Sequence, residues 1–212
     1  MPAARREPPL DAVGFARLVS VSRETLARLT LYLELLRQWQ KAINLVGAST
    51  LADPWRRHIL DCAQLFRHLP ERCASLADLG SGAGLPGLVL AAMGVDEVHL
   101  IESDRRKGQF LREAARRMEL GGVRVHQKRI EDVDLAVEAV TARALAPLAQ
   151  LLPLARPLLR PGGRLVLLKG RRVDAELTAL GEAERMRIEL HPSLADPEGR
   201  VLVLEEVASS AP

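Results

Sequence analysis

The sequence predicts a doubly wound α/β fold, and three observations support that prediction. From Ala74 onward, short apolar runs are each followed by a turn and then by a helical pattern of apolar residues. Repeated strand–helix units of this kind form a parallel sheet with helices on both faces. The chain of 212 residues is long enough to bury a core. Its composition, 48% hydrophobic and 27% charged, excludes a disordered or fibrous chain.

The first seventy residues favour helices. Ser22 stands where a helix cap belongs, and leucines then recur at spacings of three and four; these are Leu26, Leu29, Leu33 and Leu36. A second helical pattern runs from about Pro54 to Leu69, and Pro70 stands just past its end. We therefore expect a helical extension over residues 1–73, packed as one compact unit on an α/β core over residues 74–212.

The core begins with two strand–helix units. The first strand is SLADL at 75–79, which leads through a glycine turn into a helix. The second is VHLIES at 98–103, which leads through an acidic turn into a helix that we expect Gly121 to close. Further strands are expected at VRVHQ (123–127), AVTAR (139–143) and RLVLLKG (164–170), with a closing pair at RIEL (187–190) and VLVLEEV (201–207).

The turn after the first strand holds four glycines within eight residues, from Gly80 to Gly87. Glycine allows positive φ and lets the backbone approach a ligand closely. Asp78, at the end of the strand, either orients this loop or faces an ammonium group. Residues Gly82 to Gly87 also satisfy the dinucleotide pattern G-x-G-x-x-G, so the glycines alone leave more than one ligand class open.

Glu102 shifts the balance between those ligands. It ends the second strand, 22 residues beyond Gly80, where a carboxylate can accept both hydroxyls of a ribose. The turn is long and loose, which suits a nucleoside bearing an amino acid better than a pyrophosphate. These features favour S-adenosylmethionine as the cofactor. An NAD- or FAD-dependent oxidoreductase and a non-catalytic nucleotide-binding module remain as alternatives.

The chain resembles the RsmG (GidB) family of bacterial small-subunit ribosomal RNA guanine-N7 methyltransferases, from about Leu31 to Val207. The resemblance lies in the segments ADLGSGAGLPGLVLA, HLIESDRRKGQFLRE, KAINLVG, RRHILDC, TARALAPL and LLKG. It implies a Rossmann-like class I methyltransferase with a mostly parallel seven-stranded sheet and an N-terminal helical extension. It also implies S-adenosylmethionine as cofactor and a guanine N7 in 16S ribosomal RNA as target.

The resemblance further implies a set of cofactor-binding positions. Glu102 would bind the ribose, the backbone near Ile130 and Glu131 would meet the adenine edge, and Arg143 would lie by the methyl donor or the target. The full set is Gly80, Gly82, Leu85, Glu102, Ile130, Glu131 and Arg143. The chain departs from the family pattern at Cys62, where serine is expected, and at Glu102, where aspartate is common.

Five charged or polar residues are candidates for RNA contact: Arg57, His58, Lys169, Arg171 and Arg172. The first two share a helical turn with Asp61, which alternatively indicates an ion pair worth about 0.2 to 0.5 kcal/mol. Lys169, Arg171 and Arg172 lie at or just after a strand end. They either bind RNA phosphates or are solvated surface charges. The net charge of +3 is compatible with an anionic partner and decides little.

Other features exclude whole classes of function. Two cysteines without paired spacing and five scattered histidines indicate no metal site and a reducing, cytoplasmic compartment. No stretch resembles a signal peptide or a membrane span. Guanine N7 carries a free lone pair, so no general base is required and no catalytic residue is assigned. We expect a monomer acting on 16S ribosomal RNA or the small ribosomal subunit.

Overall fold

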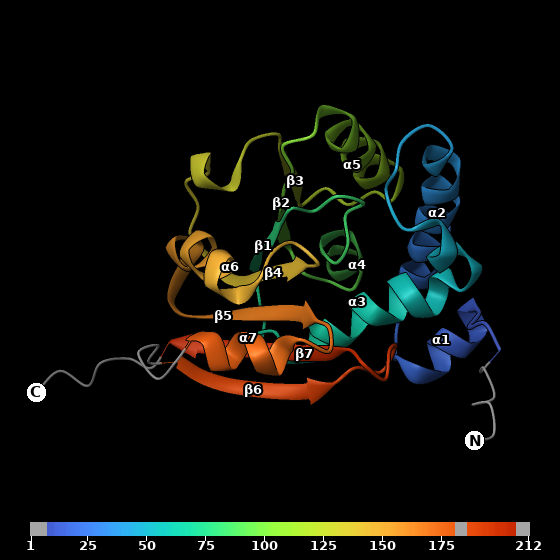
Figure 1. Ribbon diagram of the computed structural model, residues 1–212. Helices are drawn as coiled ribbons and strands as arrows, with labels where there is room; N and C mark the ends of the chain where they lie inside the picture. The colour runs from blue at the N-terminus through green and yellow to red at the C-terminus, as the bar shows by residue number, and fades with distance from the viewer. Residues whose placement is uncertain (1–7, 181–185, 207–212) are drawn as a thin grey trace, which may run out of the picture.

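A seven-stranded sheet forms the centre of the molecule, in the order β3-β2-β1-β4-β5-β7-β6 (Figure 1). The computed structural model describes residues 8–180 and 186–206. Strands β1 to β5 are parallel, whereas β7 runs antiparallel to both β5 and β6. The strands are β1 (Ser75–Leu79), β2 (Glu97–Ile101), β3 (Val123–His126), β4 (Val137–Arg143), β5 (Leu159–Lys169), β6 (Met186–Pro192) and β7 (Arg200–Glu206). The mostly parallel sheet and the closing pair are thus confirmed.

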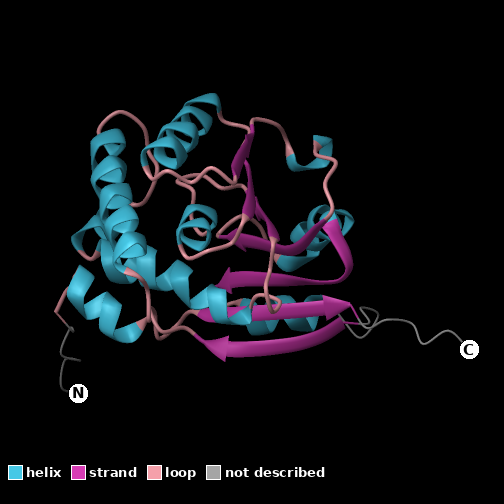
Figure 2. Cartoon of the chain, turned by 180° about the vertical axis from the view of Figure 1, so that it is seen from behind, coloured by secondary structure: helices cyan, strands magenta, loops and turns pink. Residues whose placement is uncertain are grey.

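Helices cover both faces of the sheet (Figure 2). They are α1 (Ala12–Leu18), α2 (Arg23–Gln40), α3 (Asp61–Ala63), α4 (Gly87–Ala92), α5 (Arg105–Arg117), α6 (Leu148–Ala155) and α7 (Val173–Leu180). The short helix α3 is the middle of one continuous helical stretch, which begins as a π-helix at Trp55–Leu60 and ends as a 3₁₀-helix at Gln64–His68. Single 3₁₀ turns lie at Ala48–Ala52, Ile130–Asp132 and Arg156–Leu158.

Side chains that alternate along each strand divide the core into two clusters. Leu76, Val98 and Leu100 pack with α2, α3, α4 and α5, whereas Ala77 and Ile101 pack with α6 and α7. This alternation is what a strand with a period of two requires when both faces are buried. The cluster on the first face also includes residues of the N-terminal helices, so apolar packing runs unbroken from the extension into the α/β core.

Helix α2 connects the extension to the glycine turn. Ser22 caps the helix by accepting a hydrogen bond from the Thr25 amide at 3.1 Å. One helical face then packs Tyr32 and Trp39 against Phe110 of α5, with ring centroids 6.4 and 5.7 Å apart. The buried Tyr32 hydroxyl donates to the Ala83 carbonyl at 2.8 Å. The extension therefore holds the turn that follows β1.

The end of α5 differs from the expectation that Gly121 closes it. Glu119 takes the left-handed conformation, with φ of 56°, and the Leu120 amide donates to the Ala115 carbonyl at 2.9 Å. The helix thus ends two residues early through a non-glycine residue. Gly121 lies past this cap, in the connection to β3.

Over residues 8–180 and 186–206, no helix has both the length and the apolar character needed to cross a membrane. In the same part of the chain, histidine, cysteine, aspartate and glutamate side chains do not gather in threes at metal-binding distance.

Candidate active site

The glycine turn between β1 and α4 uses the conformational freedom of its glycines. Gly80, Gly82 and Gly84 have φ of 61°, 54° and 79°, a region that L side chains rarely adopt. A Cβ added to Gly84 would overlap the Leu88 side chain, so that glycine is required by packing. A Cβ added to Gly82 would meet only the Gly80 carbonyl oxygen, at 3.7 Å. The turn is therefore open at Gly82 and closed by protein at Gly84.

Asp78 holds the two ends of this turn together. Its fully buried carboxylate accepts hydrogen bonds from the Gly87 amide at 3.0 Å and the Thr141 hydroxyl at 3.3 Å. Burial raises the pKa of this carboxyl to about 7, although those donors and Arg143 oppose the rise. Because the side chain is enclosed, Asp78 orients the loop and offers no surface to an ammonium group.

Glu102, just past β2, faces the open side of the turn. Its Oε2 accepts from the Gly82 amide at 2.9 Å and its Oε1 accepts from the Asp104 amide at 2.8 Å. The side chain is 8% exposed. A carboxylate oxygen has two lone pairs, so each oxygen can still accept one hydroxyl. The two backbone donors therefore fix the orientation of the carboxylate and leave each oxygen able to accept from a ligand.

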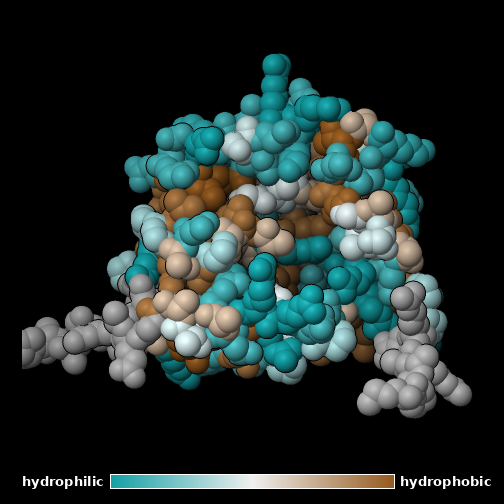
Figure 3. Space-filling model, in the orientation of Figure 1, coloured by the Kyte–Doolittle hydropathy of each residue, from teal (hydrophilic) through white to brown (hydrophobic). Residues whose placement is uncertain are grey.

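The remaining predicted cofactor positions lie around the same edge of the sheet. Leu85 is buried within the turn, Ile130 is half-buried and Glu131 is exposed on the 3₁₀ turn that follows β3. The space-filling view shows a hollow near the middle of this face, by the end of β4 (Figure 3). The open space at Gly82 and the adjoining Glu102 carboxylate, together called the cofactor cradle, fit a nucleoside without phosphates such as that of S-adenosylmethionine, because the Gly82 amide already donates to Glu102 and a carboxylate repels a phosphate.

Arg143, the last residue of β4, joins the sheet to the helical stretch 55–68. Its Nη2 donates to His58 Nδ1 at 3.1 Å, and its Nη1 lies 3.6 Å from both Cys62 Sγ and Asp61 Oδ2. Burial raises the pKa of the Asp61 carboxyl, and Arg143 and Arg57 offset part of that rise. Burial also raises the pKa of the Cys62 thiol to about 12, so this thiol is neutral.

The hydrogen bonds of His58 determine its protonation. A guanidinium has only donors, so Nδ1 must accept and Nε2 must carry the proton. Nε2 lies 2.9 Å from the Thr50 hydroxyl, which itself donates to the Gly47 carbonyl at 2.6 Å. Burial, with Arg143 and Arg57 nearby, lowers the His58 pKa to about 4. A neutral histidine therefore connects Arg143 to the loop at Gly47–Thr50.

Comparison with known proteins identifies the family. A family model described as GidB, rRNA small subunit methyltransferase G, matches residues 25–196. A ribosomal RNA small subunit methyltransferase G from Rhodospirillum centenum is 54% identical over 202 residues, covering 95% of this chain and 93% of that protein. One from Caulobacter vibrioides is 42% identical, covering 95% and 94%. The chain belongs to the rRNA small subunit methyltransferase G family.

Solved structures share the fold of this chain at low sequence identity. A ribosomal protein L11 methylase from Lactobacillus delbrueckii has a TM-score of 0.60 at 17% identity, covering 69% of this chain and 77% of that one. TYW2 from M. jannaschii, solved with AdoMet, has a TM-score of 0.53 at 16% identity, covering 68% and 72%. The fold is that of the class I methyltransferases, which confirms the predicted fold class. The family match supports S-adenosylmethionine, the predicted cofactor.

Family membership also decides the alternatives that the glycine pattern left open. The protein is a methyltransferase, and neither an NAD- or FAD-dependent oxidoreductase nor a non-catalytic nucleotide-binding module.

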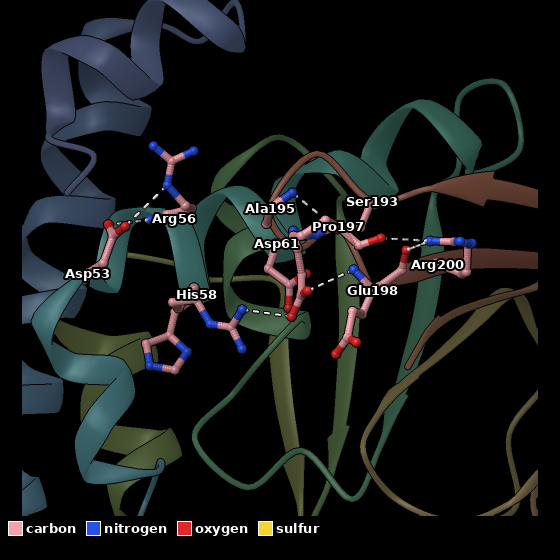
Figure 4. Close-up of polar contacts among 12 residues, drawn as sticks. Asp53, Arg56, His58, Asp61, Ser193, Ala195, Pro197, Glu198 and Arg200 are labelled. Atoms are coloured by element: carbon pink, nitrogen blue, oxygen red, sulfur yellow. Dashed lines mark hydrogen bonds and ion pairs between the residues drawn. The ribbon is translucent and has the colours of Figure 1, made fainter. Parts of the chain in front are cut away.

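The structure separates the candidates for RNA contact on the helical stretch. Arg57 is exposed but its Nη1 holds Asp196 Oδ2 at 2.7 Å, which ties the helix to the β6–β7 loop. Figure 4 shows this loop, from Ser193 to Arg200, facing Asp61, with the His58 ring turned away from it. His58 is fully buried and both ring nitrogens are engaged. The expectation that His58 touches RNA is therefore replaced by a role inside the protein.

The cations after β5 also fall into two groups. Lys169 is mostly buried, lies 2.5 Å from Glu176 Oε2 and donates to the Ala146 carbonyl at 3.2 Å. Its charge is thus used within the protein, which argues against the predicted phosphate grip. Arg171 and Arg172 are exposed, and Arg171 approaches Glu198 at 3.7 Å.

Sequence reasoning missed the partners Tyr32, Thr50 and Glu176. Tyr32 lies 51 residues from Ala83, the residue that it binds. Thr50 is only eight residues from His58, but it lies in a separate turn before the helical stretch, and no helical or strand spacing links the two. Glu176 stands seven residues after Lys169 on the next helix, so a charge-pair search across that turn would have found it.

Proposed function

We propose that this protein transfers the methyl group of S-adenosylmethionine to N7 of a guanine in 16S ribosomal RNA, acting as a cytoplasmic monomer. The observation that carries the proposal is the open glycine cradle at Gly82 joined to the fixed Glu102 carboxylate, in a chain of the methyltransferase G family. This pair of groups lies at the carboxyl edge of a parallel sheet, where ligands of such folds bind.

The residues of the cradle hold the cofactor. When bound, S-adenosylmethionine supplies an electrophilic methyl group on a sulfonium sulfur. Glu102 would accept the ribose hydroxyls, and the half-buried Ile130 with the backbone at Glu131 would meet the adenine edge. The turn residues Gly80, Gly82 and Leu85 would contact the cofactor. Arg143, at the end of β4, would lie beside the methyl donor or the target.

The chemistry places few demands on acid–base groups. Guanine N7 has an in-plane lone pair, so it attacks a methyl carbon without first losing a proton. Asp78 and His58 would not act as acid–base groups. Asp78 is enclosed by protein, and both ring nitrogens of His58 are engaged in contacts within the protein. Catalysis would then rest on orientation, for which effective molarities reach about 10⁵ to 10⁸ M in favourable cases.

His58 and Thr50 would act as positioning residues. The bond from Arg143 to His58 and the contact from His58 to Thr50 fix the guanidinium relative to the loop at Gly47. An arginine without such contacts samples many rotamers, so the contact with His58 would restrict the Arg143 side chain. Because His58 is neutral, this restriction buries no second charge.

Methyl transfer to isolated 16S ribosomal RNA and to small subunits tests the function. The protein is incubated with methyl-labelled S-adenosylmethionine and either substrate, and the RNA is digested to nucleosides. Label in 7-methylguanosine from either substrate supports the proposal, and the better substrate identifies the physiological one. Label confined to another nucleoside, or no incorporation into either substrate, would overturn it. Glu102→Ala serves as the cofactor-deficient control.

A further inference from the structure

A cavity of about 630 Å³ lies beside the glycine turn, between the loop after β4 and the beginning of α7. Its volume is within the range of about 300 to 1,000 Å³ that is typical of ligand sites. Leu145, 38% exposed, lines this cavity and also contacts the turn, because a Cβ on Gly80 would stand 2.5 Å from Leu145 Cδ1. The cavity and the cofactor cradle therefore share a wall.

The cavity is lined by apolar side chains, by one fixed acid and by the cations Lys169, Arg171 and Arg172. Leu145, Pro147 and Leu168 supply aliphatic area against which a flat ring can pack. Glu176, on α7, also lines the cavity, with 21% of its side chain exposed. Enzymes that modify a base take it out of its stack into such a pocket and read its edge by hydrogen bonds.

The Glu176 carboxylate is held by one oxygen. Oε2 accepts from the Leu148 amide at 2.9 Å and lies 2.5 Å from Lys169 Nζ. Within the part of the chain that the structure describes, Oε1 has no hydrogen-bond or ion-pair partner. The acid is thus preorganised, with an oxygen and its two lone pairs left to accept from a ligand.

We propose that this cavity takes the target guanine and that Glu176 determines the specificity for it. Guanine carries the donors N1–H and its exocyclic amine on one edge and N7 on the opposite side. Hydrogen bonds from those donors to Glu176 would leave N7 facing the Leu145 wall and the glycine turn. Adenine presents an acceptor at N1, which a carboxylate repels. The inference rests on the proposed function and adds the residue that chooses the base.

Nucleotide binding tests this assignment without methyl transfer. Guanosine, inosine and adenosine 5′-monophosphates are titrated by ligand-observed NMR with the cofactor site saturated by S-adenosylhomocysteine. We expect the wild type to bind guanosine monophosphate about 10-fold more tightly than adenosine monophosphate, the size of one hydrogen bond to a charged group. Inosine monophosphate, which keeps N1–H and lacks the amine, should fall between them.

Three variants separate recognition from structural support. Glu176→Gln should abolish the preference for guanosine over adenosine monophosphate while retaining affinity for S-adenosylhomocysteine. Lys169→Gln breaks the same ion pair but leaves the carboxylate, so the preference should persist. Glu198→Gln removes an exposed acid near Arg171 and should leave the preference unchanged.

An equal preference in the wild type and Glu176→Gln, or no preference in the wild type, would overturn the assignment. Loss of the preference for guanosine monophosphate in Lys169→Gln as well would also overturn the assignment. The preference would then depend on the intact Lys169–Glu176 ion pair and not on the Glu176 carboxylate itself. Failure of the proposed function is distinct from these results, since it appears as absent 7-methylguanosine in the methyl-transfer experiment.

Discussion

Glu102 is the residue on which cofactor affinity should depend most strongly. Its carboxylate is fixed by the Gly82 and Asp104 amides and each oxygen can accept one hydroxyl more. We expect Glu102→Ala to weaken S-adenosylhomocysteine binding by about 1.5 to 3 kcal/mol, roughly 10- to 150-fold. Calorimetric titration measures this change, with the exposed Glu97 at the start of β2, changed to alanine, as the control. Unchanged affinity in a folded Glu102→Ala protein would remove the assignment.

The two glycines at the centre of the turn should respond differently to the same substitution. Gly82→Ala places its Cβ in open space, so the folded protein should lose only about 1 to 2 kcal/mol for the left-handed backbone. Gly84→Ala drives its Cβ into Leu88 and should cost more. Urea unfolding gives the stabilities, and titration gives the cofactor affinity of whichever variant folds.

The two variants also show whether the glycine turn contacts the cofactor or only connects β1 to α4. We expect Gly82→Ala to lose cofactor binding out of proportion to its small loss of stability, because the added methyl enters the cradle. Full affinity in Gly82→Ala would show that the open side of the turn does not face the cofactor.

At the scale of elements, the sequence predicted what depends on neighbours along the chain. Hydrophobic periodicity located α2 and α5, and the glycine cluster located the β1–α4 turn. The helix end at Glu119 was missed because Gly121 is the better residue for a left-handed position. The earlier end lets Met118 and Leu120, on either side of Glu119, both pack against the core. Local preference is a weak guide wherever tertiary contacts fix the backbone.

The cluster around Arg143 shows the limit of sequence reasoning at the site. Arg143 was predicted by position, but its partner His58 is 85 residues away and had been expected at the RNA surface. A histidine in a polar, cationic segment gives no signal in the sequence that it will be buried. Only the packing of the helical stretch 55–68 against the end of β4 brings the two side chains together.

That cluster predicts a pH dependence of stability. The pKa of His58 is about 4 in the folded protein and about 6.5 in the unfolded chain, so the unfolded chain binds more protons between these values. The contribution of neutral His58 is complete above about pH 6.5 and is lost as the pH falls towards 4. At most it is on the order of 3 kcal/mol.

Urea unfolding at pH 7 and pH 5 measures this contribution. His58→Gln should lose part of the difference in unfolding free energy between the two pH values. His68→Gln is the comparison: burial also lowers the pKa of His68 to about 4, but that ring is only partly buried, so this variant should lose a smaller part of the pH dependence than His58→Gln. An identical pH dependence in wild type and His58→Gln would contradict the neutral, buried state of this ring.

At the scale of the whole molecule, exposed cations at the carboxyl edge of the sheet are the candidates for gripping RNA. Arg57 and Lys169 are held by Asp196 and Glu176, which leaves Arg171 and Arg172 as the exposed pair. Arg171 is 78% exposed and its contact with Glu198 is long, at 3.7 Å. A pair so exposed contributes little to stability, so its removal should leave the fold intact.

Changing Arg171 and Arg172 together to alanine should therefore lower RNA affinity and flatten its salt dependence. Each lost phosphate contact removes about 0.7 to 0.9 from the slope of log affinity against log salt concentration, so the loss of two contacts should reduce the slope by about 1.4 to 1.8. Affinity for S-adenosylhomocysteine should stay the same, since that nucleoside has no phosphate. Preference for the target guanine should persist as well, because phosphate contacts position an RNA and base contacts select within it.

The control for this experiment is a second arginine pair, which lies near the edge of the sheet opposite the carboxyl edge. Arg116 and Arg117 end α5, which runs back from the carboxyl edge to the opposite edge, and they lie near Glu113. Their double alanine variant has the same change in net charge but should retain the salt slope. An equal decrease of the slope in both variants would mean that RNA affinity depends only on the total charge of the protein. An unchanged slope in the Arg171 and Arg172 variant would place the RNA-binding face elsewhere on the molecule.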